Sequence, residues 1–213
     1  MSLRQLLFFL LVGPVTQLQA GTADPNDCNV TDFPKIGYYD YRDNSRRALE
    51  RRKLVEGAHF TRGVQRGLYG NTGKLIDDVN YVLRHIPNHP QALLLMYEIQ
   101  TRPGFRRNKQ GRTDYYYDSV SCYFKRAMFI APDDPAVYLT RAVIAHRDNN
   151  FKDAEADYLK ALELNEKHAE AHYNLGLLYF SQKKYAQSRQ HADKAYDLGY
   201  PLQGLKRKLA AVK

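Results

Sequence analysis

The fold of this chain is decided by residues 169–202, which read AEAHYNLGLLYFSQKKYAQSRQHADKAYDLGYPL. The segment just before it, residues 135–168, follows the same pattern, shifted by 34 positions. In both segments a small residue stands at positions eight, twenty and twenty-seven. These residues are Gly176, Ser188 and Ala195 in the later segment, and Ala142, Ala154 and Ala161 in the earlier one. Repetition at a fixed period indicates a repeat architecture.

The spacing within each segment predicts two antiparallel helices joined by a tight turn. Small residues let the two backbones approach where the helices cross. Aromatic side chains such as Tyr158 and Tyr179 fill the space between the helices. Residues 148–150 and 183–184 fall where the turns must lie, and Pro135 suits a first helical turn. The sequence therefore predicts an all-α fold.

Two looser units precede this pair. Residues 90–134 make a unit with an inserted basic loop, residues 102–114, and Tyr97 occupies its small-residue position. Residues 56–89 make a degenerate unit, because Leu75 and Val82 are bulky for their positions. Before these units, residues 21–55 are predicted to be irregular with some helix.

A short capping helix is predicted after the last unit. Gly199 and Pro201 break the chain, and leucines then recur at helical spacing over residues 203–213. A solenoid needs such a cap to close its open apolar end.

The period and its small residues resemble the tetratricopeptide repeat (TPR). The resemblance implies an all-α, short TPR solenoid of antiparallel helix pairs with a C-terminal capping helix. Strings such as Tyr39-Asp40-Tyr41, residues 173–179 and residues 195–202 are similar to those of uncharacterised bacterial exported TPR proteins. That likeness implies a cell-envelope setting and no biochemical activity.

The first twenty residues predict a secretory signal peptide. Arg4 precedes an unbroken apolar run, residues 6–12, and Ala20 offers a small residue at a cleavage point. An uncleaved N-terminal anchor is the alternative, although the run is too short to span a bilayer as a stable helix. Removing residues 1–20 lowers Lys+Arg from 32 to 31 against 23 acids, so the formal charge changes from +9 to +8. We expect a periplasmic or secreted protein with no stable membrane insertion after cleavage.

The two cysteines, Cys28 and Cys122, suggest one disulfide, because exported chains meet an oxidising environment. Such a bridge would tie the irregular N-terminal segment to the repeat body. The alternative is two unpaired thiols, with Cys122 acting as a small buried residue.

No catalytic motif is visible, and we expect neither an enzyme nor a cofactor. The chain lacks G-x-S-x-G, a phosphate-binding glycine loop and H-E-x-x-H. His168 and His172 are four residues apart, but no third ligand is placed near them, and a metal site needs three or four. We interpret them as cap and core residues, and we predict no metal site.

The resemblance implies that certain positions of each first helix face a concave groove. This surface is expected to be apolar and aromatic, and either a partner segment or the chain's own residues 32–43 could fill it. Of the positions that clamp a peptide's terminal carboxylate, only Asn174 matches, so that ligand is disfavoured. The predicted groove residues are Phe60, Leu94, Glu98, Leu139, Val143, Tyr173, Asn174, Leu177 and Phe180.

The insertion is strongly basic and is followed by three consecutive tyrosines. Basic and aromatic residues together can bind nucleic acid, but export argues against that partner. An anionic polysaccharide or lipid phosphate fits better, and a solvated loop without a ligand is the simpler alternative. The basic residues are Arg102, Arg106, Arg107, Lys109 and Arg112.

The sequence thus favours an exported adaptor or scaffold that binds a protein or peptide partner in a bacterial cell-envelope assembly. The alternative is a binder of an anionic envelope polymer through the insertion.

The cysteine hypothesis has a direct test. We expect alkylation under non-reducing conditions, read by mass spectrometry, to label no thiol in the exported chain, and to label two after reduction. Two labelled thiols before reduction would contradict the disulfide.

Overall fold

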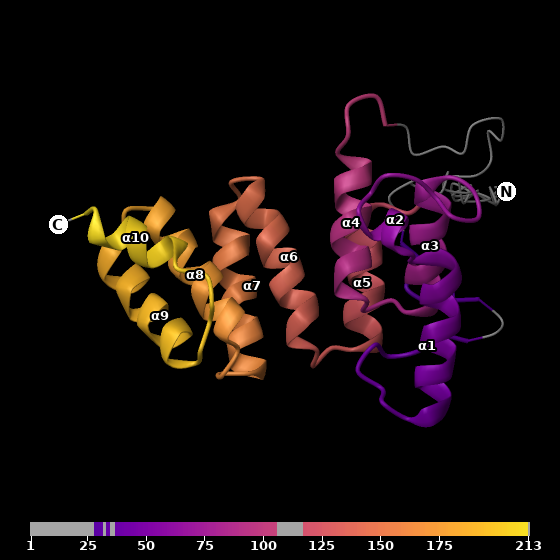
Figure 1. The fold of residues 1–213 in the computed structure, drawn as a ribbon, viewed down its shortest axis with the longest axis horizontal. Coiled ribbons are helices and arrows are strands. Elements are labelled where there is room, and N and C mark those ends of the chain that lie inside the picture. Colours follow the sequence, from indigo (N-terminus) through magenta and orange to yellow (C-terminus); the bar gives the residue numbers. More distant parts are fainter. Residues whose placement is uncertain (1–27, 32, 35–36, 106–116, 213) are drawn as a thin grey trace, which may run out of the picture.

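The computed structural model describes residues 28–31, 33–34, 37–105 and 117–212. Over these residues the chain forms α-helices and no strand, and the helices follow one another along the long axis (Figure 1). This confirms the predicted all-α solenoid. The helices are α1 (Arg46–His59), α2 (Arg62–Gln65), α3 (Leu75–His85), α4 (Pro90–Gln100), α5 (Val120–Ile130), α6 (Pro135–Arg147), α7 (Phe151–Leu164), α8 (Ala169–Ser181), α9 (Tyr185–Asp197) and α10 (Gly204–Ala210).

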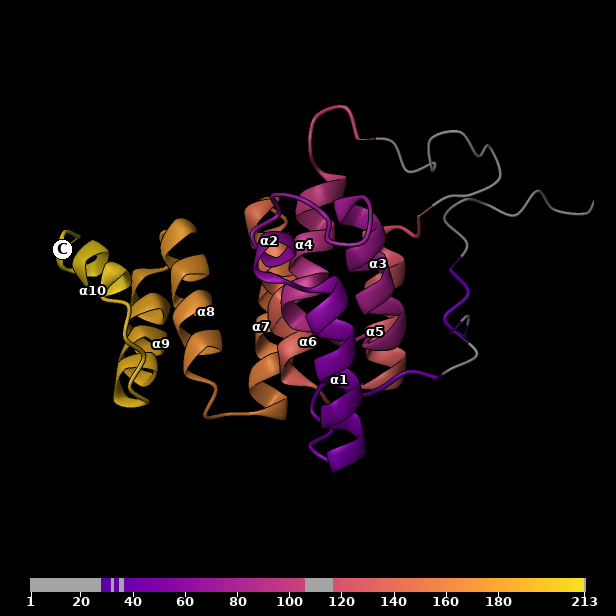
Figure 2. The ribbon, with the colours of Figure 1, turned by 45° about the vertical axis from the view of Figure 1, so that its right-hand side comes forward.

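The C-terminal half contains two matching helical hairpins, α6–α7 and α8–α9 (Figure 2). Each turn holds one non-glycine residue in the left-handed region, Asn149 and Lys183, both with φ of 60°. These two residues lie 34 positions apart, so the sequence repeat is also a repeat of backbone conformation. The turns fall where the sequence predicts them.

Small residues bring the helices of each hairpin together. Ala142, Ala154 and Ala161 are completely buried between α6 and α7. In the next hairpin, Ser188 on α9 donates a hydrogen bond of 2.8 Å to the Gly176 carbonyl on α8. Any side chain at Gly176, or one larger than serine at position 188, would push the neighbouring elements apart.

The N-terminal half departs from the predicted division. A repeat is expected to begin at residue 56, but α1 starts at Arg46 and runs through that point to His59. The helix starts early because Ser45 caps it, accepting a hydrogen bond from the Ala48 amide. Gly63 then leaves room for the Tyr69 ring, whose edge fills the space that a Cβ at this position would need.

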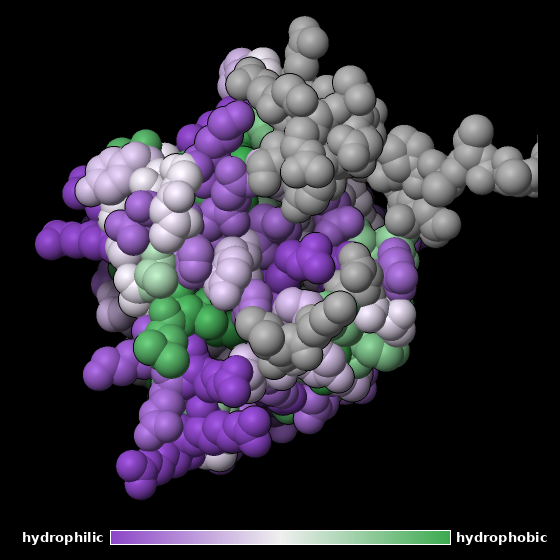
Figure 3. Space-filling view, turned by 90° about the vertical axis from the view of Figure 1, so that its right-hand side faces the viewer, coloured by the Kyte–Doolittle hydropathy of each residue, from purple (hydrophilic) through white to green (hydrophobic). Residues whose placement is uncertain are grey.

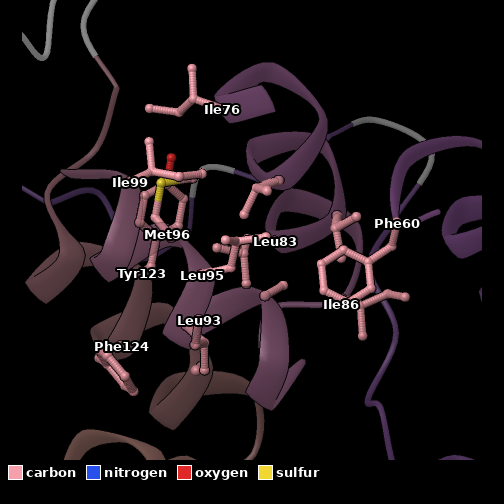
Figure 4. Close-up of a cluster of buried hydrophobic side chains, with 14 of the residues drawn as sticks. Phe60, Ile76, Leu83, Ile86, Leu93, Leu95, Met96, Ile99, Tyr123 and Phe124 are labelled. Carbon is pink, nitrogen blue, oxygen red and sulfur yellow. The ribbon is translucent and has the colours of Figure 1, made fainter. Parts of the chain in front are cut away.

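A continuous hydrophobic core joins α3, α4 and α5 (Figure 4). Leu83 and Ile86 point toward Phe60 on one side, and Met96 and Tyr123 meet on the other. All five side chains are buried. Core packing therefore holds this half together although it lacks the small-residue pattern.

Three turns between helix pairs share one capping device. His89, Asp134 and His168 precede α4, α6 and α8, and each side chain accepts a hydrogen bond from a backbone amide in the first helical turn. Proline follows at the first helical position of α4 and α6. The first helix of each pair thus begins at an equivalent point.

Residues 37–43, which we call the N-terminal strap, are tied to these turns through Asn88. The fully buried Asn88 amide donates to Asp40 at 2.7 Å and to Asp134 at 2.8 Å, and its oxygen accepts from the Tyr41 amide at 2.8 Å. Arg42 pairs with Asp40 at 2.6 Å and Asp133 at 2.8 Å, offsetting the gathered negative charge. One side chain thereby connects the strap to two successive turns.

A disulfide joins Cys28 to Cys122 on α5, across a sequence separation of 94 residues, as the sequence predicts. Beside it, Arg126 donates to the Asn29 carbonyl at 3.2 Å. The residues before the strap are therefore held against α5 both covalently and by a hydrogen bond.

The chain ends in α10, which packs on α8 and α9. Its Leu205 and Leu209 are buried with Tyr173, Ala192 and Ala195. α10 therefore covers the apolar end that the last hairpin would otherwise expose.

Replacing Asn88 by alanine tests the strap. We expect Asn88→Ala to lower the free energy of unfolding by about 2 kcal/mol, because buried polar groups lose their partners. Urea unfolding followed by circular dichroism measures this. Asn165→Ala, at an exposed asparagine in the turn before α8, is the matched control and should change stability little. Equal effects of the two substitutions would contradict the role of Asn88.

Candidate functional site

A groove of about 500 Å³ runs across the first helices of three successive pairs. These helices, α4, α6 and α8, succeed one another along the long axis (Figure 1). Four predicted groove residues, Leu94, Leu139, Val143 and Asn174, lie together in its lining. The full lining is Pro90, Gln91, Leu94, Ala136, Leu139, Thr140, Val143, Arg147, His168, Glu170 and Asn174.

The groove has an apolar floor and a polar rim. Leu94 and Val143 are half-buried, so part of each side chain faces the open space. Around them stand the side chains of Gln91, Asn174 and Arg147, which carry hydrogen-bond donors. The expectation of an aromatic surface is wrong, because no aromatic side chain of the described residues other than His168 lines the groove.

Arg147 is a groove residue that the sequence reasoning missed. It forms an ion pair of 3.0 Å with Glu98, and both side chains are about half exposed. Glu98, a predicted groove residue, therefore stands beside the lining and engages one of its members. Arg147 lies four residues after Val143 on the same helix, and that helical spacing could have identified it.

Phe60 and Tyr173 are corrected by the structure. Phe60 is 2% exposed and packs edge-on against His89 in the core, because α1 ends just before it. Tyr173 is 6% exposed and contacts Tyr200, because the chain after α9 folds back over α8. Neither side chain belongs to the groove lining.

Leu177 and Phe180 also lie outside the groove lining. Both pack against the cluster formed by α8, α9 and α10, and Lys208 of α10 stands over the Phe180 ring at 5.6 Å. The capping helix thus covers the C-terminal end of the surface that the sequence assigns to a partner.

The described residues of the N-terminal segment leave the groove open. None of residues 33–34 and 37–43 belongs to its lining. The strap instead lies at the turns before α4 and α6. Self-filling by the predicted segment 32–43 is therefore not seen for the part that the structure describes.

His168 and His172 have the cap and core roles that we expect for them. His168 Nδ1 accepts from the Ala171 amide and begins α8. His172 is buried, and its Nε2–H donates to the Glu166 carbonyl at 2.9 Å. Its Nδ1 must therefore accept from Nδ1–H of His191, 3.0 Å away on α9. Within the described ranges, no three histidine, cysteine or carboxylate side chains are arranged to hold a metal.

The paired imidazoles are held neutral by their surroundings. Burial, together with the nearby His172 and Lys194, lowers the pKa of His191 to about 4. Burial also lowers the pKa of His172. Because burial disfavours the charged form of both rings, this contact between α8 and α9 is expected to be sensitive to acid.

The basic insertion lies mostly outside the described residues. Arg106, Arg107, Lys109 and Arg112 fall there, and Arg102 is the only predicted member that the structure describes. Arg102 donates to the Gly67 carbonyl at 3.1 Å. The predicted signal peptide also lies outside the described part, within which no helix is long and apolar enough to cross a membrane.

Comparison with known proteins places the fold in a class. Residues 139–199 match the family model described as tetratricopeptide repeat. Among solved structures, TTC0263, a thermophilic TPR protein in Thermus thermophilus, is 17% identical and has a TM-score of 0.54, covering 78% of this chain and 84% of that one. The MamA protein is 16% identical with a TM-score of 0.50, covering 76% and 80%. No curated protein matches the chain in sequence.

At these identities the two structures establish likeness of fold alone. Together with the family match over α6–α9 and the repeated hairpin geometry, they define an α-solenoid of paired helices. Residues 139–199 are tetratricopeptide repeats, and the described residues have the fold of a TPR solenoid. This fold suggests a scaffold for protein–protein interaction, and TPR scaffolds are generally not enzymes.

The histidine pair generates a pH prediction. An unfolded histidine titrates near pH 6.5, so between pH 6.5 and about 4 the unfolded chain binds protons that folded His191 does not. Stability should therefore be complete above pH 6.5 and decline as the pH falls toward 4. We expect His191→Gln to show a weaker decline in thermal melts across this range. Equal pH dependence in both proteins would contradict the assignment.

Proposed function

We propose that this chain is an exported adaptor that holds a segment of a partner protein in the groove between α4, α6 and α8. The observation that carries the proposal is the meeting of Leu94, Val143 and Asn174, from three different helices, in one open groove. An apolar floor beneath polar donors is the arrangement that binds a protein segment, because it serves both side chains and main chain.

The chemistry of the groove favours an extended segment. Gln91 and Asn174 carry amide groups that can both donate to and accept from a peptide backbone. Leu94 and Val143 belong to the same lining and can receive alternate apolar side chains of such a segment. We infer that the partner presents a short extended stretch with apolar residues at alternate positions.

The setting we propose is the periplasm or the outside of a bacterial cell, within an envelope assembly. The predicted signal peptide and the Cys28–Cys122 disulfide support export. The disulfide also leaves the groove free for a partner, because it attaches the first described residues to α5 and neither cysteine belongs to the groove lining.

Site-specific crosslinking tests the groove. A photoreactive amino acid at Val143 should capture the partner in intact cells, whereas the same group at Leu159, exposed on α7, should not. With the captured partner, we expect Val143→Asp to weaken binding by at least about tenfold, because the carboxylate must be desolvated against an apolar side chain. Leu159→Asp is the matched control.

Two results would overturn the proposal. One is capture of the same partner from Leu159 but not from Val143. The other is unchanged affinity of Val143→Asp for the captured partner, provided that its thermal melt shows a folded chain.

A further inference from the structure

The beginning of α1 protrudes from the molecule. Its first turns extend below the level of the turns that precede α4 and α6 (Figure 1). Seen from the right-hand side of Figure 1, hydrophilic side chains project at the lower left and a hydrophobic area lies above them (Figure 3).

Two of the arginines on α1 serve to fix the helix. Arg52 donates to the Tyr41 carbonyl at 2.5 Å and stands over the Tyr41 ring at 4.9 Å. Arg51 stands over the Tyr39 ring at 5.6 Å. These contacts bind α1 to the strap and set which face of the helix points outward.

The outward face carries an excess of positive charge. Arg46 is 93% exposed and pairs with Glu50 one turn away at 3.0 Å. Arg47 and Lys53 are exposed and have no ion pair in the described part of the chain. Three cations therefore stand against one carboxylate on a face that nothing described covers.

Two leucines accompany these cations. Leu54 is 72% exposed and Leu49 is 40% exposed. Beside Leu49, a surface pocket of about 450 Å³ is also lined by Arg52 and Lys53. One exposed leucine is ordinary on a protein surface. Two beside exposed cations give this face apolar contact and positive charge, the two terms that add to binding at an anionic membrane surface.

We propose that the outward face of α1 docks on a membrane surface rich in anionic phospholipid. Arg46, Arg47 and Lys53 contact the phosphate headgroups, and Leu54 enters the boundary between headgroups and acyl chains. A hydrophilic anionic polymer would satisfy the cations but would gain nothing from Leu54. The leucine therefore favours lipid.

This surface is separate from the groove. No residue of α1 belongs to the groove lining, which comes from α4, α6, α8 and the residues just before them. A chain docked through α1 can therefore hold its partner at the same time, and each site can be tested without the other.

Vesicle sedimentation tests the proposal. The probes are vesicles of phosphatidylcholine with about one third phosphatidylglycerol, and vesicles of phosphatidylcholine alone. A chain beginning at Gly21 retains every described residue and removes the apolar run at 6–12; it is measured beside the full chain. We expect binding to the anionic vesicles that weakens with salt and is lost without phosphatidylglycerol.

The substitutions separate charge from apolar contact. Arg47→Glu with Lys53→Glu should weaken binding by at least about tenfold, since each basic residue near an anionic surface contributes roughly fivefold. Leu54→Ser should weaken it by a smaller factor. The matched controls are Lys152→Glu with Lys167→Glu, and Leu159→Ser, at exposed positions of the C-terminal half. These controls should bind as the unchanged chain does.

Three outcomes would overturn the proposal: no sedimentation of the chain beginning at Gly21 with anionic vesicles, equal binding to both vesicle types, or equal effects of the α1 and control substitutions. A fourth outcome would assign the face to a polymer instead: the chain binds soluble polygalacturonate, and Leu54→Ser changes neither that binding nor the binding to vesicles. Thermal melts of every variant verify that it is folded.

Discussion

The repeat architecture depends on the close approach of two helices at a small residue where they cross. A Cβ added at Gly176 would lie 2.7 Å from Leu205 Cδ2 and 3.3 Å from the Ser188 carbonyl oxygen. One missing side chain therefore admits both the hairpin partner α9 and the cap α10. The same spacing recurs at Ala142, and the turn residues Asn149 and Lys183 repeat the same backbone geometry. Equivalent hairpins stack in the same way, and their first helices consequently line one continuous face.

The N-terminal half lacks these small residues and is held together by other contacts. Tyr97 occupies a small-residue position, where it packs against the core, and its hydroxyl donates to Asp148 in the next helix pair. The insertion separates α4 from α5, and the disulfide and Asn88 supply the tertiary links that the repeat pattern does not. A degenerate repeat can therefore still stack on the next repeat when long-range contacts replace the close helix packing that small residues would allow.

The two proposed surfaces follow from this division. Regular stacking brings three first helices together and forms the groove, whereas the irregular beginning leaves α1 extended beyond the stack. Cation–π contacts of Arg51 and Arg52 with the strap fix its outward face. Because the cap covers the C-terminal end of the groove face, the open part of that face is confined to α4, α6 and the start of α8.

The sequence by itself determined the helix pairs of residues 135–202, their turns, the disulfide partners and four residues of the groove lining. The helix pairs and turns depend on local periodicity, the disulfide on cysteine chemistry, and the groove positions on the resemblance to the tetratricopeptide repeat, all of which can be recognised in the sequence. Only the tertiary structure decided the rest. The start of α1 depended on the helix cap supplied by Ser45. The burial of Phe60 and Tyr173 depended on contacts with His89 and Tyr200, which lie far along the chain from each of them. The pairing of Arg147 with Glu98 likewise joins two helices far apart in sequence. A periodic pattern specifies which side of a helix faces its neighbour, but which distant segment covers the other side is settled by packing alone.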